Sequence, residues 1–406
     1  MCEPAKNHSR VLKGSRAHGR ICMNKRQAIY AACAVLASFA PGAAQAQSEF
    51  KVGFVLSQIG PLAELAKTYL DGAEVGVAMV NDTGGIGGLK VRLIACDAQG
   101  QEPQAVICAK KLINDDKVNL MIGATGTPQT MAIIPTVESA GVPLFGMGAG
   151  RVIWEPVKKW VFKSFPSNDD QIPAELNYAK KKGWNRVALL TDNTSFGKDT
   201  VEMTREVVKK NGMELVAEES YAPSDTDITA QVTRVRAANP DVVLNLAGTI
   251  PLGILVAKKA TQLGMKTPLV QGMNFVVENY PSMVPQAIDQ SYFAGSKMMV
   301  DLPPSDPLYA NITVFRKKYA AMRGASAKPN GNTITVPDIL LMVQKVTQGM
   351  GAKVLDPEAL RSAIEGARDI PELQGIWNLS PTNHGNSFAA GTVVLTNVKG
   401  EWKLAQ

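Results

Sequence analysis

The chain has 406 residues, of which 45% are hydrophobic and 19% charged, and its formal net charge is +7. The first 46 residues hold seven Lys or Arg and one Glu, so they account for +6 of that charge. The remaining 360 residues are nearly neutral, which excludes the basic surplus of a nucleic-acid-binding surface. This length exceeds the roughly 250–300 residues that one hydrophobic core supports, so we expect two lobes.

The first 46 residues have the organisation of a secretory signal peptide. A basic region at 20–26 is followed by an apolar run at 28–40 and by a small-residue cleavage motif that ends at Ala46. The apolar run is too short to span a membrane. We expect cleavage after Ala46 and secretion of the remainder. Met23 is a candidate start, which would make the residues before it an upstream extension.

Two cysteines, Cys96 and Cys108, remain after the predicted cleavage site. Secretion places them in an oxidising compartment, where a disulfide persists. Cys96 ends a predicted strand and Cys108 lies in the helix that follows. We therefore expect a disulfide between them, with two buried thiols as the alternative. No histidine lies nearby to complete a metal site, and we expect neither metal nor cofactor.

Short apolar strands alternate with longer helices through the first half of the secreted chain. The predicted strands are Phe50–Leu56, Lys90–Asp97, Asn119–Ile122, Val142–Gly146 and Val161–Ser164. The predicted helices are Leu62–Asn81, Pro103–Asn114, Gln129–Ala140 and one that opens at Ser167–Asp169 and runs to Lys182. The glycine run Gly84–Gly88 follows a helix and precedes a strand, the reverse of a dinucleotide-binding fingerprint. We interpret it as a helix cap and a turn.

The same alternation restarts after Phe165-Pro166-Ser167. The predicted strands there are Arg186–Thr191, Glu214–Ser220, Val242–Leu246, Leu269–Gln271, Trp377–Leu379 and Thr392–Asn397, and the predicted helices are Gly197–Asn211, Thr226–Ala238, Leu252–Leu263, Tyr309–Met322 and Val336–Gln348. Strand–helix alternation predicts parallel, doubly wound α/β sheets with ligands at the carboxyl ends of the strands.

One stretch, Asn119–Pro135, combines a short strand, a loop of small residues and the start of a helix. Pro128 suits the first helical turn, where a missing N–H costs nothing. Bare backbone N–H groups and the helix dipole favour an anionic group at such a place. Thr125 and Thr127 add hydroxyl groups. The stretch is a candidate anion site, and an ordinary strand-to-helix turn is the alternative.

Three segments carry a family resemblance. GPLAELAKTYLDGAEVGVAMVNDTGGIGGLKVRL (Gly60–Leu93), the run from Met121 to Pro143, and the ending GIWNLSPTNHGN…LTNVKGEWKL resemble periplasmic leucine/isoleucine/valine-binding proteins. The resemblance covers essentially all of Phe50–Gln406. It implies a type I periplasmic-binding-protein fold, in which two α/β lobes with doubly wound parallel sheets enclose a ligand cleft.

The resemblance also implies how the chain is divided and what it does. One lobe is expected at 47–165 plus 298–372 and the other at 166–297 plus 373–406, joined by three crossings. The protein is expected to be a periplasmic monomer that closes on a small ligand and passes it to the membrane permease of an ABC importer. A sensor that feeds a signalling partner is an alternative, because the same fold serves that role.

Ligand-binding positions in the first lobe follow from the same resemblance. Thr127 matches the hydroxyl residue that holds the ligand carboxylate, and Thr125 matches a position of backbone contacts. Gly148 and Gly150 fall in a second glycine loop, where amino-acid binders often have Ala and Thr, so a hydroxyl contact is lost at Gly150. Leu65 of the first helix is also expected to contact the ligand.

Further candidates flank these positions. Phe196 matches an aromatic residue that closes over the ligand from the second lobe, and Thr249 falls where a Tyr is common. Arg151 follows the second glycine loop and is a candidate partner for the ligand carboxylate, with a surface position as the alternative.

Asn274 is the main departure from the family pattern. Amino-acid binders place a Glu there that pairs with the ligand ammonium, and an ammonium gains much less from an amide than from a carboxylate. We therefore expect a ligand with a carboxylate and no α-ammonium, such as an aromatic or short aliphatic acid. Branched-chain amino acid binding is the alternative.

An enzyme is disfavoured by the residues present. The secreted part has one histidine, His384, and contains neither a G-x-S-x-G nucleophile motif nor a P-loop. We expect no catalytic residues.

Overall fold

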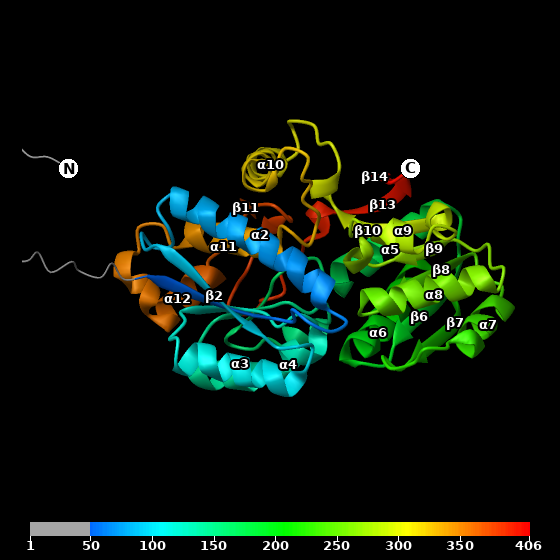
Figure 1. The fold of residues 1–406 in the computed structure, drawn as a ribbon, viewed down its shortest axis with the longest axis horizontal. Helices are drawn as coiled ribbons and strands as arrows, with labels where there is room; N and C mark the ends of the chain where they lie inside the picture. The colour runs from blue at the N-terminus through cyan, green and yellow to red at the C-terminus, as the bar shows by residue number, and fades with distance from the viewer. Residues whose placement is uncertain (1–48) are drawn as a thin grey trace, which may run out of the picture. The chain divides into compact units, whose positions relative to one another are not determined.

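The computed structural model describes residues 49–406. The predicted signal peptide and its cleavage after Ala46 lie outside these residues. Two separate sheets organise the described part, and helices surround each of them (Figure 1). We call the portion built on the five-stranded sheet the first lobe and the portion built on the seven-stranded sheet the second lobe.

The five strands of the first lobe are all parallel and run in the order β2-β1-β3-β4-β5. They are β1 (Phe50–Leu56), β2 (Val91–Asp97), β3 (Leu120–Ile122), β4 (Leu144–Gly146) and β5 (Val161–Lys163). The helices of this lobe are α2 (Ala63–Asp82), α3 (Glu102–Asn114), α4 (Thr127–Ala140), α10 (Tyr309–Arg323), α11 (Thr335–Val346) and α12 (Pro357–Glu365). This order matches the doubly wound sheet predicted from the sequence.

Helices cover both faces of this sheet. α2 and α11 pack together over one face, and α3 and α4 pack together over the other (Figure 1). The absence of a side chain at Gly72 allows α2 to approach the segment before α11 closely. A Cβ at Gly72 would lie 1.7 Å from the backbone oxygen of Thr333. Any larger residue at position 72 would therefore force the two segments apart.

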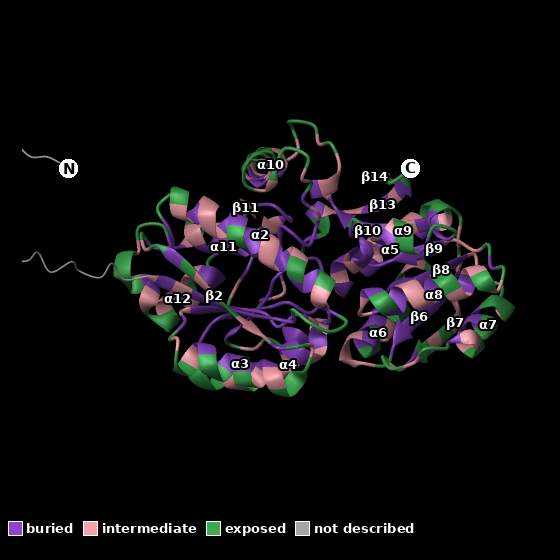
Figure 2. Cartoon of the chain, viewed as in Figure 1, coloured by how far each residue is buried: buried purple, intermediate pink, exposed green. Residues whose placement is uncertain are grey.

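The seven strands of the second lobe run in the order β14-β13-β10-β9-β8-β6-β7. They are β6 (Arg186–Asp192), β7 (Glu214–Tyr221), β8 (Val242–Leu246), β9 (Leu269–Gln271), β10 (Ser291–Ser296), β13 (Thr392–Val398) and β14 (Glu401–Leu404). Its helices are α5 (Asn168–Lys181), α6 (Ser195–Asn211), α7 (Thr229–Ala237), α8 (Ile250–Gln262) and the short α9 (Tyr280–Met283). β6 and β8 are buried, whereas α3 and α7 carry exposed residues on their outer sides (Figure 2).

The second sheet differs from the prediction in two ways. β13 pairs antiparallel with β10, and β14 pairs antiparallel with β13, so the sheet is parallel only through its other five strands. The sequence prediction also missed β10 and β14. β10 lacks a continuous apolar run because it begins and ends with serine, and β14 alternates charged residues on an edge.

A small hairpin lies near the end of the chain. β11 (Ile370–Pro371) pairs antiparallel with β12 (Ile376–Trp377), so the predicted strand 377–379 is shorter and begins one residue earlier. Trp377 and Phe388 are buried with the core of the first lobe. We therefore propose that the last crossing into the second lobe lies between Phe388 and β13 rather than at residue 373.

A buried ionic cluster links the segments that cross between the lobes. Lys163 of β5 is fully buried, and its Nζ lies 2.7 Å from Asp169 Oδ1 and 2.6 Å from Asp170 Oδ2 at the start of α5. Asp170 Oδ1 accepts a hydrogen bond from the backbone N–H of Phe388 at 2.8 Å, in the last crossing. Burial raises the pKa of Asp169 to about 6, and Lys163 opposes that rise. The cluster therefore holds β5, the start of α5 and the segment at Phe388 together.

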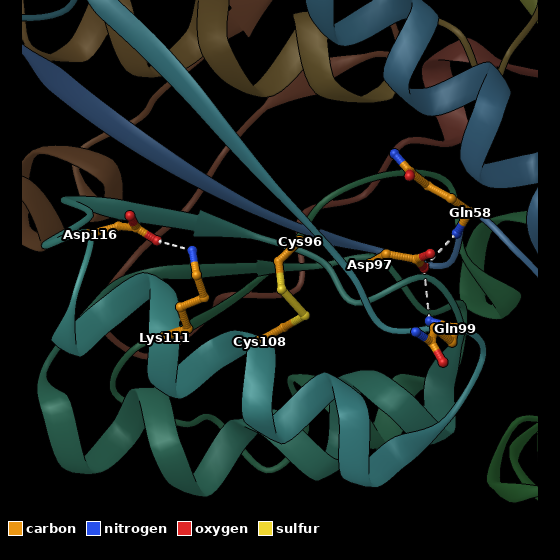
Figure 3. The surroundings of a disulfide bond; sticks show 7 residues. All are labelled: Gln58, Cys96, Asp97, Gln99, Cys108, Lys111 and Asp116. Atoms are coloured by element: carbon orange, nitrogen blue, oxygen red, sulfur yellow. Dashed lines mark hydrogen bonds and ion pairs between the residues drawn. A yellow bond between two sulfur atoms is a disulfide. The ribbon is translucent and has the colours of Figure 1, made fainter.

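The predicted disulfide is present. Cys96 of β2 and Cys108 of α3 are bonded with a Cα–Cα distance of 5.6 Å (Figure 3). Next to it, Asp97 Oδ1 accepts hydrogen bonds from the backbone N–H groups of Gln58 and Gln99 at 2.9 and 2.8 Å (Figure 3). The disulfide and Asp97 together fix the loop that follows β2.

Removing the disulfide is expected to destabilise the first lobe. The bond closes a short loop, with a sequence separation of 12. Loss of such a cross-link in the Cys96→Ala/Cys108→Ala double variant is expected to lower the free energy of unfolding by about 3 kcal/mol. Urea unfolding of both proteins measures the difference. An unchanged midpoint would contradict the expectation, and reduction of the wild type should reproduce the loss.

Stability is expected to fall as pH rises because of Glu372. This carboxyl is buried, its Oε2 accepts from Asn311 Nδ2 at 3.2 Å, and burial together with Asp338 raises its pKa from 4.5 to about 8. The folded state therefore keeps a proton that the unfolded state loses, so stability declines between about pH 4.5 and pH 8.

The Glu372→Gln variant tests this linkage, since its side chain is neutral at every pH in that window. Its unfolding free energy should decline less between pH 5 and pH 8 than that of the wild type, as measured by urea unfolding at both pH values. An equal decline would show that Glu372 does not carry the dependence.

Two general features bear on function. Within residues 49–406, no helix is long and apolar enough to cross a membrane. The same part of the chain contains no group of three or more His, Cys, Asp or Glu residues that could hold a metal ion.

Candidate ligand-binding cleft

A cavity of about 210 Å³ is lined by residues of both lobes. The first lobe contributes residues of α2, the N-terminus of α4 and the loop after β4, and the second lobe contributes residues of α5 and the loops after β6, β8 and β9. These loops follow the carboxyl ends of parallel strands, which is where ligands bind in open α/β sheets. Leu62, Leu65, Met147, Phe165 and Leu252 make much of the wall apolar.

The N-terminus of α4 forms one polar side of the cavity. Thr127 is the first residue of α4, is 2% exposed and lines the cavity. Its Oγ1 accepts a hydrogen bond from the backbone N–H of Gly150 at 3.1 Å. The hydroxyl therefore has its own proton left to donate to a ligand, and the positive end of the helix dipole favours an anion beside it.

Two glycines let the loop after β4 approach this helix terminus. A Cβ at Gly148 would lie 2.6 Å from Thr127 Cα and 2.7 Å from Thr127 N, and a Cβ at Gly150 would lie 2.8 Å from Thr127 Cγ2. Side chains at these positions would displace Thr127. The absence of a hydroxyl at Gly150 therefore has a packing reason, because Thr127 occupies the space a threonine would need.

The second lobe supplies Phe196, Thr249 and Asn274, all of which line the cavity. Asn274 Nδ2 donates to the backbone oxygen of Ala247 at 3.0 Å, which fixes the orientation of its amide. Glu278, the nearest acidic residue after it, is exposed and does not line the cavity. Neither position 274 nor position 278 therefore contributes a carboxylate to the described cavity wall.

Asp192 is the one charged side chain among the lining residues of the described chain. It lies at the end of β6 and is 2% exposed. Its Oδ2 accepts from the backbone N–H of Gly248 at 2.7 Å, and its Oδ1 accepts from the backbone N–H of Thr194 at 3.1 Å. Asp192 thus holds two cleft loops together and also places negative charge beside the cavity.

Six of the predicted ligand-binding positions line this cavity: Leu65, Thr127, Gly148, Phe196, Thr249 and Asn274. Thr125, Gly150 and Arg151 do not. Thr125 is fully buried behind the loop, and Gly150 contributes its N–H to Thr127 instead of to the cavity wall.

The structure does not support Arg151 as a partner of the ligand. Its guanidinium forms an ion pair with Glu206 of α6 at 3.1 Å, and its backbone N–H donates to Asp199 Oδ2 at 3.0 Å. The hydrogen bond and charge of Glu206 raise the pKa of Arg151. Burial raises the pKa of the Asp199 carboxyl, and the donors around it oppose that rise. Arg151 therefore links the first lobe to the second, beside the cavity.

Several lining residues were not predicted. Asp192, Gln171 and Asn332 are polar examples. Asp192 directly follows the predicted strand Arg186–Thr191, so its position at the carboxyl edge of the sheet was a signal that could have found it. Gln171 and Asn332 lie in a helix and in a turn before a helix, where no pattern marked them.

Comparison with known proteins places this fold and cleft in a family. Residues 49–400 match the family model described as "Periplasmic binding protein". The chain therefore belongs to this periplasmic binding protein family. The family is one of ligand-binding proteins rather than enzymes, it binds small molecules, and membership implies a periplasmic location.

Curated relatives include Leu/Ile/Val-binding proteins. The Leu/Ile/Val-binding protein homolog 7 of Brucella abortus (strain 2308) is 28% identical over 247 residues, covering 58% of this chain and 61% of that protein. The Leu/Ile/Val-binding protein of Escherichia coli (strain K12) is 25% identical over 245 residues, covering 60% and 65%. These matches confirm the predicted resemblance. The matched part spans about three fifths of the length of these relatives.

Solved structures confirm the fold. An extracellular ligand-binding receptor from Rhodopseudomonas palustris HaA2 superposes with a TM-score of 0.79 at 25% identity, covering 88% of this chain and 100% of the other. The branched-chain amino acid transporter substrate binding protein LivJ from Streptococcus pneumoniae, solved with isoleucine, superposes with a TM-score of 0.76 at 21% identity, covering 88% and 99%. The predicted type I binding-protein fold is correct.

Proposed function

We propose that this protein captures a small carboxylate-bearing ligand, an aromatic or short aliphatic acid, and delivers it to the membrane permease of an ABC importer. The observation that carries the proposal is the N-terminus of α4, where the Thr127 hydroxyl faces an otherwise largely apolar cavity. A carboxylate at this position accepts from that hydroxyl and lies at the positive end of the helix dipole. No Lys, Arg or His lines the described cavity, so no cationic side chain there competes with the N-terminus of α4 for the ligand carboxylate.

The second lobe supports a ligand without an α-ammonium. Position 274 carries an amide whose Nδ2 is already bonded to Ala247. A buried ammonium needs a carboxylate or several acceptors, and Asn274 offers at most its one amide oxygen. An acid whose remainder is apolar fits the neighbouring Phe196 and Leu252 without such a partner.

Branched-chain amino acid binding is the second candidate, and Asp192 is the observation that favours it. Its carboxylate lines the cavity. Oδ1 accepts from both the backbone N–H and the hydroxyl of Thr194, whereas Oδ2 accepts from Gly248 alone and has capacity for a further donor. A ligand ammonium beside Asp192 would gain a charged partner. If this alternative holds, leucine binds tightly and Asp192→Asn weakens it.

Closure of the cleft follows from the two-sided wall. The carboxylate contacts Thr127 in the first lobe, and the remainder of the ligand contacts Phe196 and Asn274 in the second. A ligand that makes both sets of contacts only in the closed state shifts the equilibrium toward that state. The ion pair between Arg151 and Glu206 adds a contact that also exists only while the lobes are close.

A thermal-shift screen over amino acids and aromatic or aliphatic acids tests the proposal. A ligand at 100 times its Kd stabilises the folded state by about 2.7 kcal/mol, which raises the midpoint measurably. We expect benzoate-type or short aliphatic acids to raise the midpoint. If leucine raises the unfolding midpoint and no ammonium-free acid does, the proposal is refuted and branched-chain amino acid binding is favoured.

Replacing Thr127 by alanine is expected to weaken binding of the acid found in that screen. The variant loses a hydrogen bond to a charged group, which corresponds to about 1–2 kcal/mol, or roughly 5- to 30-fold in Kd. Calorimetric titration measures the change. Thr125→Ala is the matched control, because its hydroxyl is buried, has no hydrogen-bond partner and does not line the cavity. Equal affinities for the wild type and Thr127→Ala would remove Thr127 from the site.

A further inference from the structure

The cavity wall contains a buried amide that the carboxylate site leaves unused. Asn332 lines the cavity and is 3% exposed, and its Nδ2 has no hydrogen-bond partner in the described structure. A buried N–H donor without a partner costs free energy, so such donors are paired in nearly all folded proteins. This donor therefore needs an acceptor, and the residue that carries it lines the ligand cavity.

The backbone holds Asn332 firmly in place. Its N–H donates to Asn330 Oδ1 at 2.9 Å, and its carbonyl oxygen accepts from the N–H of Thr335 at 3.2 Å, where α11 begins. The next residue, Thr333, is packed against Gly72 of α2. Movement of this turn away from the cavity would disrupt the contact between α2 and α11, so the amide does not reach a protein partner by a backbone shift.

The neighbourhood of Asn332 also belongs to the cleft. A Cβ at the adjacent Gly331 would lie 3.3 Å from Met273 Sδ, and Met273 lines the cavity from the second lobe. Asn332 comes from the first lobe, and its neighbour Gly331 approaches Met273 of the second. It is therefore placed to contact a part of the ligand other than the carboxylate at the N-terminus of α4.

We propose that Asn332 recognises a second oxygen acceptor on the ligand, so that the preferred substrates are carboxylic acids with a further oxo, hydroxyl or amide oxygen. This inference rests on the proposed function and deepens it by naming the ligand class. The Asn332 Nδ2 group donates to that oxygen while Thr127 donates to the carboxylate. An acid without the second oxygen leaves the buried donor unpaired and binds more weakly.

Two matched pairs of acids test the proposal by calorimetric titration: benzoate with 4-hydroxybenzoate, and pentanoate with 4-oxopentanoate. In the wild type, the oxygen-bearing member of at least one pair should bind about tenfold more tightly. In Asn332→Leu, which is similar in size and has no donor, that preference should disappear while the plain acid keeps its Kd within about threefold. Asn332→Asp, which replaces the donor by an acceptor, should weaken the oxygen-bearing acid as well.

Asn397→Leu is the control, because Asn397 is also buried with an unpartnered Nδ2 but lies on β13 outside the cavity wall. It should keep the wild-type preference. Binding of plain and oxygen-bearing acids with equal affinity, or a preference that survives in both Asn332 variants, would overturn this inference alone. Binding of none of the four acids would overturn the proposed function and the inference with it.

Discussion

Replacement of Lys163 by methionine is expected to lower the free energy of unfolding by about 3–5 kcal/mol, the largest stability effect we predict for a single side chain. Lys163 is fully buried and is the cation between Asp169 and Asp170. Methionine has a similar length and packs in apolar surroundings. The loss of stability therefore comes from the two carboxyl groups, which remain buried without the Lys163 ammonium.

Lys159→Met is the matched control for this substitution. Lys159 also pairs with one carboxylate, Glu358, at 2.5 Å, but both side chains are about half exposed, at 52% and 53%. Exposed pairs contribute about 0–1 kcal/mol, so this variant should unfold almost like the wild type. Urea unfolding compares the three proteins. Equal midpoints for Lys163→Met and Lys159→Met would show that the buried cluster does not stabilise the fold.

Replacement of Gly148 by alanine is expected to cause the largest loss of ligand binding, more than about tenfold in Kd. A methyl group there would lie 2.6 Å from Thr127 Cα and 2.7 Å from its backbone nitrogen. Neither atom belongs to a flexible side chain, so the first turn of α4 has to shift. The Thr127 hydroxyl, which we propose donates to the ligand carboxylate, moves with this turn. A shift of even a fraction of an ångström weakens a hydrogen bond of defined geometry.

Gly366→Ala is the control for Gly148→Ala. Gly366 follows α12 with φ of −81°. A Cβ added there would lie 3.2 Å from its nearest neighbour, the backbone oxygen of Ala363. Titration of the acid identified by thermal shift gives the Kd of each variant. Wild-type affinity in Gly148→Ala would mean that the ligand does not use the N-terminus of α4, whereas Gly366→Ala should bind normally.

The sequence predicted the parts of the candidate site that depend on local pattern. The strand, small-residue loop and helix around Thr127 were recognisable because glycine, proline and threonine each have a positional role there. The disulfide between Cys96 and Cys108 was predictable because one cysteine ends a strand and the other lies in the next helix. These features involve residues that are close in the chain.

Features that depend on distant contacts were not predictable in the same way. Arg151 was expected near the ligand, but Glu206, 55 residues later, pairs with its guanidinium. Asn332 has no pattern of its own, and it lines the cleft only because α11 packs on α2. Trp377 and Phe388 follow the predicted boundary at 373 and yet pack in the core of the first lobe. Each of these outcomes is decided by tertiary packing rather than by neighbouring residues.

Titration of the wild-type protein with benzoate and with leucine, under the same conditions, tests the central claim most directly. The claim is that the cleft keeps a carboxylate site at the N-terminus of α4 and lacks an ammonium site at Asn274. We predict that benzoate binds at least about tenfold more tightly than leucine, because burying an ammonium beside an amide is unfavourable. Tight binding of leucine, with no measurable binding of benzoate, would contradict the claim.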